Sequence, residues 1–333
     1  MSTAGALPRP AVDPELSALL EQLPPFETLT AETLPAIRPH SSAPVEPLLK
    51  NLDADRTEHT VVTEDGHELA ISVFTPRGLQ SPAPGVYWLH GGGMVMGDRF
   101  ALIDIPLQWL TEFGFIVASI EYRLAPEVHG ETPVRDAFAG LVWFAENAPA
   151  LQVDPSRILV AGISAGGGLA AGVTLLARDT GLVNVAAQAL LCPMLDHRNA
   201  STSSRQFTGP GNWSHESNAF AWASLIGPDG DRTVTSYMSP SIAENFSGLP
   251  PTYIDAGTAE VFRDEDVDYA TKIWGAGGDA ELHIWAGGFH GFDSVFPEAA
   301  LSVRARHTRT QWVKRILGPD PHREPRIVGP APD

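Results

Sequence analysis

A serine flanked by glycines, at a point where a strand must turn directly into a helix, constrains this chain more than any other feature. Residues 158–169 read Ile-Leu-Val-Ala-Gly-Ile-Ser-Ala-Gly-Gly-Gly-Leu, with apolar runs on both sides of Ser164. At such a junction the two backbones nearly touch, so a side chain at Gly162 or Gly166 would clash. The pattern therefore predicts a buried strand, a sharp turn that holds the Ser164 hydroxyl outside the sheet, and a helix.

Strand-like and helix-like runs alternate along most of the chain. Such alternation is typical of a mostly parallel sheet covered by helices on both faces. The expected fold class is therefore α/β. The expected strands are a hairpin (59–63 and 68–74), 85–89, 116–121, the run before Ser164, 186–192, 251–255 and 281–285, and the expected helices are 103–112, 133–147, the run after Ser164, 265–275 and 297–316.

A length of 333 residues favours one large domain with an added or inserted part. Residues 1–50 contain two short helical patterns, 14–23 and 31–37, and could not bury a core of their own. Residues 196–246 are polar, irregular and rich in aromatic side chains, with one helical piece at 216–226. An insertion after a strand usually lies over the carboxyl edge of the sheet, where α/β proteins bind ligands. We expect an α/β core of residues 51–195 and 247–317, a cap made of 1–50 and the insertion 196–246, and a proline-rich tail, 318–333.

The charge of the chain argues against polyanionic partners. It has 22 basic and 40 acidic residues and a net charge of −18, which repels nucleic acid and anionic membrane surfaces. Cys192 is the only cysteine, so no intrachain disulfide can form, and we expect a reducing, cytoplasmic location. No segment reads as a signal peptide or a membrane span, and we expect neither.

A serine hydroxyl needs a general base before it can act as a nucleophile. Among 11 histidines, His290 is the candidate, because it lies in a glycine-rich stretch directly after the expected strand 281–285. If this strand runs parallel to the strand before Ser164, their carboxyl ends meet at one edge of the sheet. The glycines around His290 predict a flexible, exposed loop.

A third residue, an acid, should orient the imidazole, and we expect it between the strand at 251–255 and His290. Glu260 lies in the loop after that strand and is the candidate. Asp264 is the runner-up, but an acid at the start of a helix is explained by the helix dipole alone. Asp255 falls within the strand itself.

Acyl transfer also requires donors for the developing oxyanion. Residues 90–93, His-Gly-Gly-Gly, follow the expected strand 85–89, and three glycines would let backbone N–H groups approach a substrate. A glycine-rich loop could instead hold phosphate, but neither Gly-x-Gly-x-x-Gly nor Gly-Lys-Ser/Thr accompanies it. The second donor should be the amide of Ala165, directly after the candidate nucleophile.

These motifs together resemble the hormone-sensitive lipase-like branch of the α/β-hydrolases, called family IV among bacterial esterases. The resemblance is carried by residues 90–93, 122–127, 162–167, 237–240, 260–265 and 290–292, in the family's order, within 58–316. It implies Ser164 as nucleophile, His290 as base and acid, and Glu260 as the third member of a triad. It also implies an oxyanion hole made by the amides of Gly92, Gly93 and Ala165, with His90, Gly91, Gly162 and Gly166 as supporting motif residues.

Two positions depart from the family pattern. Ile163 precedes the serine where Asp is usual, and Glu260 stands where the family usually has the shorter Asp. The resemblance further implies an enzyme without metal or cofactor that can form a homodimer through the edge strand 281–285. The implied function is a serine carboxylesterase that acts on small-molecule esters with short- to medium-chain acyl groups.

Other functions remain open for the same residues. A lipase, a lactonase or an amidase would use the same triad, and hydrolysis of a series of acyl substrates would separate them. A protein of another class, which binds a small molecule on this fold without turnover, is the remaining alternative. Such relatives have lost a triad member, so the presence of both His290 and Glu260 favours the enzyme.

Overall fold

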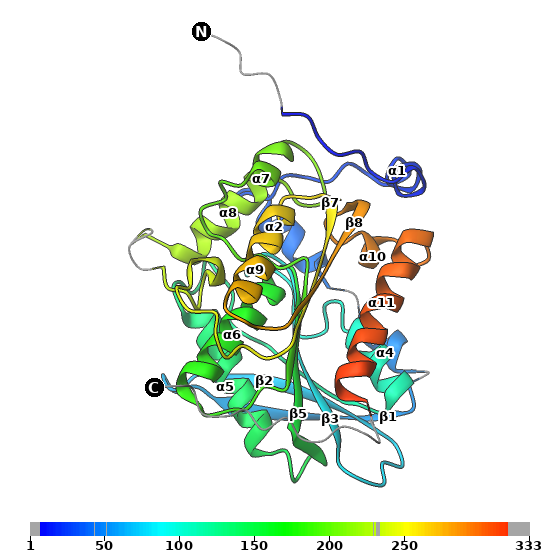
Figure 1. Ribbon diagram of the computed structural model, residues 1–333, viewed down its shortest axis with the longest axis vertical. Coiled ribbons are helices and arrows are strands. Elements are labelled where there is room, and N and C mark those ends of the chain that lie inside the picture. The colour runs from blue at the N-terminus through cyan, green and yellow to red at the C-terminus, as the bar shows by residue number, and fades with distance from the viewer. Residues whose placement is uncertain (1–6, 43, 51, 229, 231–233, 319–333) are drawn as a thin grey trace.

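The computed structural model describes residues 7–42, 44–50, 52–228, 230 and 234–318. Within these residues, eight strands form one sheet through the centre of the molecule (Figure 1), in the order β1-β2-β4-β3-β5-β6-β7-β8. β2 runs antiparallel to its neighbours β1 and β4, and every other neighbouring pair is parallel. The mostly parallel sheet of an α/β fold is therefore confirmed.

The strands are β1 (Ala54–Val62), β2 (Glu68–Pro76), β3 (Ala83–Leu89), β4 (Ile116–Ile120), β5 (Val153–Ile163), β6 (Ala187–Leu191), β7 (Thr252–Ala259) and β8 (Ala280–Phe289). β3, β4 and β6 are buried along their whole length, as expected of parallel strands covered on both faces. β1 and β8 form the two edges of the sheet. The edge strand predicted to pair in a homodimer lies within β8, and the pairing itself stays a prediction.

Helices cover both faces of the sheet. α4 (Asp104–Phe113) and α11 (Ala300–Leu317) lie on one face, and α5 (Thr132–Glu146), α6 (Ala165–Thr180) and α9 (Arg263–Gly275) lie on the other (Figure 1). Each layer packs an apolar core against the sheet. These helices match the predicted ones to within a few residues at either end.

Further helices gather near the carboxyl ends of the parallel strands. α7 (Thr202–Gln206) and α8 (His215–Ile226) belong to the insertion after β6, and α1 (Pro14–Leu20) lies beside β8 and α10 (Phe292–Val295) (Figure 1). The Asp13 carboxylate caps α1 by accepting from the N–H groups of Glu15 and Leu16. The Leu16 side chain is buried against Phe289 and Phe292.

The remaining short helices are α2 (Leu34–Ile37), η1 (Arg38–His40), α3 (Glu46–Leu49) and η3 (Pro240–Ile242). The predicted helix at 31–37 is shorter than expected, because its first residues form a turn held by the Thr30 hydroxyl. The domain boundaries stay predictions, and the predicted tail lies outside the described residues from 319 onward. In the part of the chain that the structure describes, no helix is both long and apolar enough to cross a membrane.

Candidate active site

Ser164 occupies the turn between β5 and α6. Its backbone angles, φ 57° and ψ −122°, lie outside the regions that residues with a β-carbon prefer. Two backbone hydrogen bonds hold the turn: the Ser164 N–H donates to the Leu191 carbonyl (2.7 Å), and the Ser164 carbonyl accepts from Met194 (2.9 Å). A β-carbon at Gly162 would lie 2.1 Å from the carbonyl oxygen of Gly166. The turn therefore needs glycine there, as predicted.

His290 and Glu260 meet Ser164 at the carboxyl edge of the sheet. His290 Nε2 lies 3.0 Å from Ser164 Oγ, and His290 Nδ1 lies 2.6 Å from Glu260 Oε2. The other Glu260 oxygen accepts from the Gly257 N–H at 2.6 Å. Because a carboxylate only accepts, we assign the imidazole proton to Nδ1, which leaves Nε2 as an acceptor for the serine hydroxyl. The arrangement can remove a proton from Ser164.

Glu260, and not Asp264, lies against the imidazole. β7 ends at Ala259, so Glu260 is the first residue beyond the strand. Asp264 instead faces the insertion: its Oδ2 accepts from the Ser203 N–H (2.7 Å), and its own N–H donates to the Ser203 hydroxyl (3.1 Å). Asp264 therefore links α9 to α7. The explanation from the helix dipole alone, given for Asp264 in the sequence analysis, did not include this contact.

The segment before His290 is not the flexible, exposed loop that its glycines predicted. β8 continues through this segment to Phe289, which pairs with Ala259 of β7. The two strands approach so closely that a β-carbon at Gly257 would lie 2.0 Å from the carbonyl oxygen of Gly288. Glycine here permits close strand packing, and His290 is consequently only 8% exposed.

Two side chains that sequence reasoning missed also contact His290. Asn212 Nδ2 donates to the His290 carbonyl at 2.5 Å, and the Phe262 ring packs edge-on to the imidazole with ring centroids 5.0 Å apart. Asn212 belongs to the insertion, whereas Phe262 closely follows Glu260 in the chain. Sequence position could have suggested Phe262, but no local signal marks Asn212, since its contact depends on how the insertion folds back.

The glycine-rich loop after β3 runs alongside the nucleophile. Gly92 and Gly93 have φ values of 112° and 64°, in the region that favours glycine. A β-carbon at Gly91 would lie 3.4 Å from the Ser164 β-carbon. Ala165 is the first residue of α6, and N–H groups in a first helical turn have no partner within the helix. The loop and the start of α6 therefore both adjoin Ser164.

His90 supports this loop from inside the protein. The ring stacks on Tyr122 with centroids 4.2 Å apart, and the Tyr122 hydroxyl donates to the His90 carbonyl at 2.8 Å. His90 Nδ1 lies 2.7 Å from the Gly91 carbonyl oxygen. Burial lowers the pKa of His90, so the ring is held neutral. Its surroundings agree with the supporting role that the resemblance implies.

Ile163 stands where the resemblance leads one to expect Asp. The side chain is buried in the apolar core between the sheet and the layer of α4 and α11. Its Cγ2 lies 3.5 Å from the position that a β-carbon at Gly91 would take. Apolar packing therefore supports the glycine-rich loop at this point.

A buried group of charges lies near the Glu260–His290 pair and was also missed. Arg309 of α11 pairs with Asp293 of α10, and its Nη2 lies 3.6 Å from Asp255 Oδ2 on β7. Burial raises the pKa of Asp255 to about 6, and the neighbouring Asp293 also raises it, against the opposing effect of Arg309. Asp293 follows His290 in the chain, and Asp255 precedes Glu260. Arg309 therefore links the segment that carries His290 to the segment that carries Glu260.

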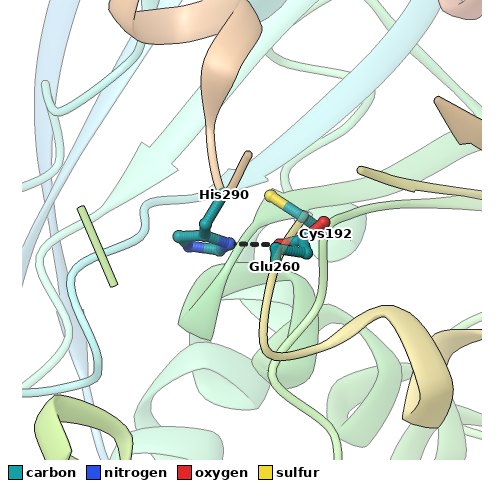
Figure 2. A group of neighbouring side chains, drawn as sticks. All are labelled: Cys192, Glu260 and His290. Atoms are coloured by element: carbon teal, nitrogen blue, oxygen red, sulfur yellow. Dashed lines mark hydrogen bonds and ion pairs between the residues drawn. The ribbon is translucent and has the colours of Figure 1, made fainter. Parts of the chain in front are cut away.

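Cys192 lies beside the Glu260–His290 pair (Figure 2). The ligand atoms of Cys192, Glu260 and His290 lie within 4.8 Å of one another, a donor set that Zn²⁺ accepts. However, Glu260 and His290 are bonded directly to each other, and burial raises the pKa of the Cys192 thiol. A metal would need the thiolate that burial disfavours. The arrangement therefore suits a hydrogen-bonded acid–base pair better than a metal centre.

A cavity of about 500 Å³ opens beside His290. One wall comes from residues between Arg9 and Phe26, and another from the loop 207–214 before α8. The end of β8 and Ala259 complete it on the sheet side. Residues from both predicted parts of the cap therefore face the site.

Comparison with known proteins assigns the chain to a family. The family described as alpha/beta hydrolase fold matches residues 86–294. Carboxylesterase NlhH of Mycobacterium tuberculosis is 33% identical over 312 residues, which cover 90% of this chain and 95% of that protein. The structure of a bacterial heroin esterase is 36% identical and superposes with a TM-score of 0.86, covering 92% of this chain and 98% of that one. Esterase LipW from Mycobacterium marinum is 30% identical, with a TM-score of 0.82 and coverage of 93% and 99%.

The relatives are named as esterases, and each match covers nearly the whole length of the relative. The two solved structures share the fold described above. The chain therefore belongs to the α/β-hydrolase fold family, in its hormone-sensitive lipase-like branch, and is a carboxylic ester hydrolase.

Proposed function

We propose that this enzyme cleaves carboxylic esters through an acyl-enzyme formed on Ser164. His290 takes the hydroxyl proton as the serine oxygen attacks the ester carbonyl, and then gives that proton to the departing alcohol. The imidazole next deprotonates a water molecule, which attacks the acyl-enzyme and releases the acid. The observation that supports this most directly is the pair of contacts that His290 makes, 3.0 Å to Ser164 and 2.6 Å to Glu260.

Glu260 holds the imidazole in the productive tautomer and stabilises the cation that forms during both steps. The longer side chain of Glu is accommodated because its second oxygen is tied to the Gly257 N–H. The carboxylate is 1% exposed, so water competes little for the bond to Nδ1. In this proposal Glu260 acts through His290 and does not touch the ester.

The amides of Gly92, Gly93 and Ala165 are proposed to stabilise the oxyanion that develops on the ester carbonyl. N–H groups aimed at such an atom, in a site shielded from water, lower the barrier without having to reorganise. The positive φ values of both glycines and the position of Ala165 at the start of α6 support this role. The cap would leave room for acyl groups of short to medium length.

Labelling with a fluorophosphonate tests the proposal, because such probes phosphonylate activated serines. We expect one probe per chain, located by peptide mass spectrometry on the peptide that contains Ser164. The Ser164→Ala variant should not be labelled, and His290→Gln should be labelled far more slowly. Stable modification of another residue, with Ser164 unmodified and esterase activity lost, would contradict the assignment.

A further inference from the structure

The proposed oxyanion hole depends on the direction in which the Gly93 N–H points. This N–H belongs to the trans peptide unit between Gly92 and Gly93, in which the N–H and the carbonyl point in opposite directions. The Gly92 carbonyl accepts from the N–H groups of Val95 and Met96, both at 3.1 Å. Among the residues that the structure describes, no acceptor takes the Gly93 N–H. The contacts that hold Val95 and Met96 therefore also orient a proposed oxyanion donor.

Arg38 holds the peptide unit between Val95 and Met96. Its Nε donates to the Val95 carbonyl at 2.7 Å. The N–H of the same peptide unit is that of Met96, which donates to the Gly92 carbonyl. The contact from Arg38 therefore reaches the Gly92 carbonyl through one rigid peptide plane, and the Gly93 N–H through a second.

A second set of contacts holds the neighbouring peptide unit. The Met94 carbonyl accepts from the Ala125 N–H at 2.8 Å, and Arg38 Nη2 donates to the Ala125 carbonyl, also at 2.8 Å. Met94 and Val95 share a peptide unit, so the contact with Ala125 fixes the Val95 N–H. Arg38 thus supports one of the two donors to the Gly92 carbonyl directly and the other through Ala125.

The guanidinium group is itself held in a fixed orientation. Glu127 accepts from it at two points, from Nη1 at 2.6 Å and from Nη2 at 3.0 Å, and such a bidentate pair fixes the plane of the group. Arg38 begins η1, and the hydroxyl oxygen of Ser41, directly after this helix, accepts from the Gly97 N–H at 2.8 Å. Two side chains of one short segment therefore hold the turn 94–97, and neither of them lines the cavity described above.

We propose that Arg38 is a positioning residue for ester hydrolysis, which orients the Gly93 N–H toward the oxyanion through the peptide units of residues 92–96. This inference rests on the proposed function, because it assumes that the Gly93 amide stabilises the charge on the ester carbonyl. Arg38 does not touch the ester. Its contribution arises as negative charge develops on the carbonyl oxygen, so it supports kcat more than substrate binding.

Arg38→Ala tests this role through two measurements that should change together. With p-nitrophenyl acetate, kcat should fall about 10- to 100-fold while KM changes less than about twofold, because a misdirected donor costs less than the 10²- to 10³-fold loss of a whole one. The affinity for a trifluoromethyl ketone should fall by a similar factor. This probe mimics the charged intermediate: Ser164 Oγ bonds to its carbonyl carbon, the serine proton passes to His290, and the former carbonyl oxygen becomes negative.

The ketone separates a positioning role from a merely structural one. Loss of a structural contact would lower the stability of the variant and leave the affinity for the ketone close to that of the wild type. Unchanged kcat, or a fall in kcat with unchanged affinity for the ketone, would overturn the inference.

Arg178→Ala is the matched control. The Arg178 side chain also pairs with a carboxylate and donates to two backbone carbonyls, those of Asn245 and Ser247, but it lies in the last turn of α6. This variant should lose stability in urea while keeping kcat and the affinity for the ketone. An equal fall in kcat for Arg38→Ala and Arg178→Ala would assign the effect to general destabilisation and overturn the inference.

Arg38→Lys gives a second measurement if the alanine variant folds poorly. A lysine keeps the charge opposite Glu127, but its ammonium group cannot reproduce the planar fork that reaches Val95 and Ala125 together. We therefore expect kcat and the affinity for the ketone to fall in parallel, by about fivefold or more. Wild-type values of both in a folded Arg38→Lys variant would contradict the role of the fork.

Failure of the inference and failure of the proposed function give different results. If Ser164 resists the fluorophosphonate and Ser164→Ala hydrolyses the ester like the wild type, the proposed function is wrong and the inference falls with it. If Ser164 is labelled and Arg38→Ala keeps the wild-type kcat and affinity for the ketone, only the inference is wrong.

Discussion

The sheet side of the site and its cap side differ in how their side chains are held. On the sheet side, Ser164, Glu260 and His290 are each less than one-tenth exposed, and hydrogen bonds join them in one row. On the cap side, Phe26 and Phe207 are half-buried and line a cavity. Backbone and sheet geometry thus determine the positions of the reacting atoms, whereas packing between separate segments determines the shape of the cavity.

The two regions also differ in how much core supports them. Both faces of the sheet pack against large apolar cores. α1 instead packs through a small cluster around Leu16, Phe289 and Phe292. We therefore expect substitutions on the sheet side to abolish turnover or folding, and substitutions on the cap side to change selectivity at a small cost in stability. The four predictions that follow test the sheet side of this contrast.

The largest effect is expected for Ser164→Ala. The variant should fold like the wild type while turnover of a small ester falls by about 10⁶-fold, since the triad acts as a unit. Steady-state kinetics together with circular dichroism would check both parts. Turnover close to that of the wild type would remove Ser164 from the mechanism.

Glu260→Gln should have the next largest effect. The amide keeps the shape of the side chain but cannot hold the imidazole in the same tautomer, so turnover should fall by up to about 10⁴-fold with the fold retained. Asp264→Asn is the matched control, because Asp264 lies nearby but contacts Ser203 of the insertion after β6. It should cost at most about 1 kcal/mol of stability and little turnover. The reverse pattern would make Asp264 the third member of the triad.

Arg309→Met should destabilise the sheet side strongly. Removing the cation leaves Asp255 and Asp293 buried without a partner charge, and breaking such a pair costs about 3–5 kcal/mol of unfolding free energy. Urea denaturation would measure the loss. If charge is the cause, adding Asp255→Asn and Asp293→Asn to the Arg309→Met variant should recover most of it, and no recovery would assign the loss to packing.

The smallest effect on stability is expected at Asp266 of α9. This residue is fully buried, and its carboxylate oxygens have no hydrogen-bond partner in the described structure. Burial, and then the charge of Glu260, raise its pKa well above 3.8. Above about pH 4 the unfolded chain ionises while the folded protein retains the proton, so this group lowers the free energy of unfolding as pH rises. Asp266→Asn should therefore gain stability over the wild type with increasing pH.

Urea denaturation between about pH 4 and pH 8 would measure this gain. Asp268→Asn is the control on the same helix, because its side chain is 52% exposed and pairs with Lys272. The difference in unfolding free energy between Asp268→Asn and the wild type should not grow with pH in the same way. A difference for Asp266→Asn that stays constant over the whole range would contradict the raised pKa.

The parts of the site that could be predicted from the sequence follow local backbone rules. The turn at Ser164 requires glycine two residues before and after, and this requirement is visible in the sequence. His290 and Glu260 could be placed because parallel strands bring their carboxyl ends to one edge. The fold could be predicted for the same reason, since strands and helices alternate at regular intervals.

The parts that could not be predicted depend on contacts between distant segments. Asn212 and Arg309 reach the site only after the insertion folds back and α11 packs on the sheet. The glycines before His290 were misread, because glycine permits either a flexible loop or a close approach of two strands. Only the neighbouring strand β7 distinguishes the two cases, because its Gly257 packs closely against Gly288 of β8.

The packing of α1 on the end of β8 has a consequence for the order in which the protein assembles. The ribosome makes α1 long before it makes Phe289 and Phe292, so the apolar side of Leu16 has no covering surface during most of synthesis. The wall between Arg9 and Phe26 must therefore close after the sheet has formed. Because so few buried residues hold this wall, local opening should cost less there than in the two cores that cover the sheet, and amide hydrogen exchange should be faster.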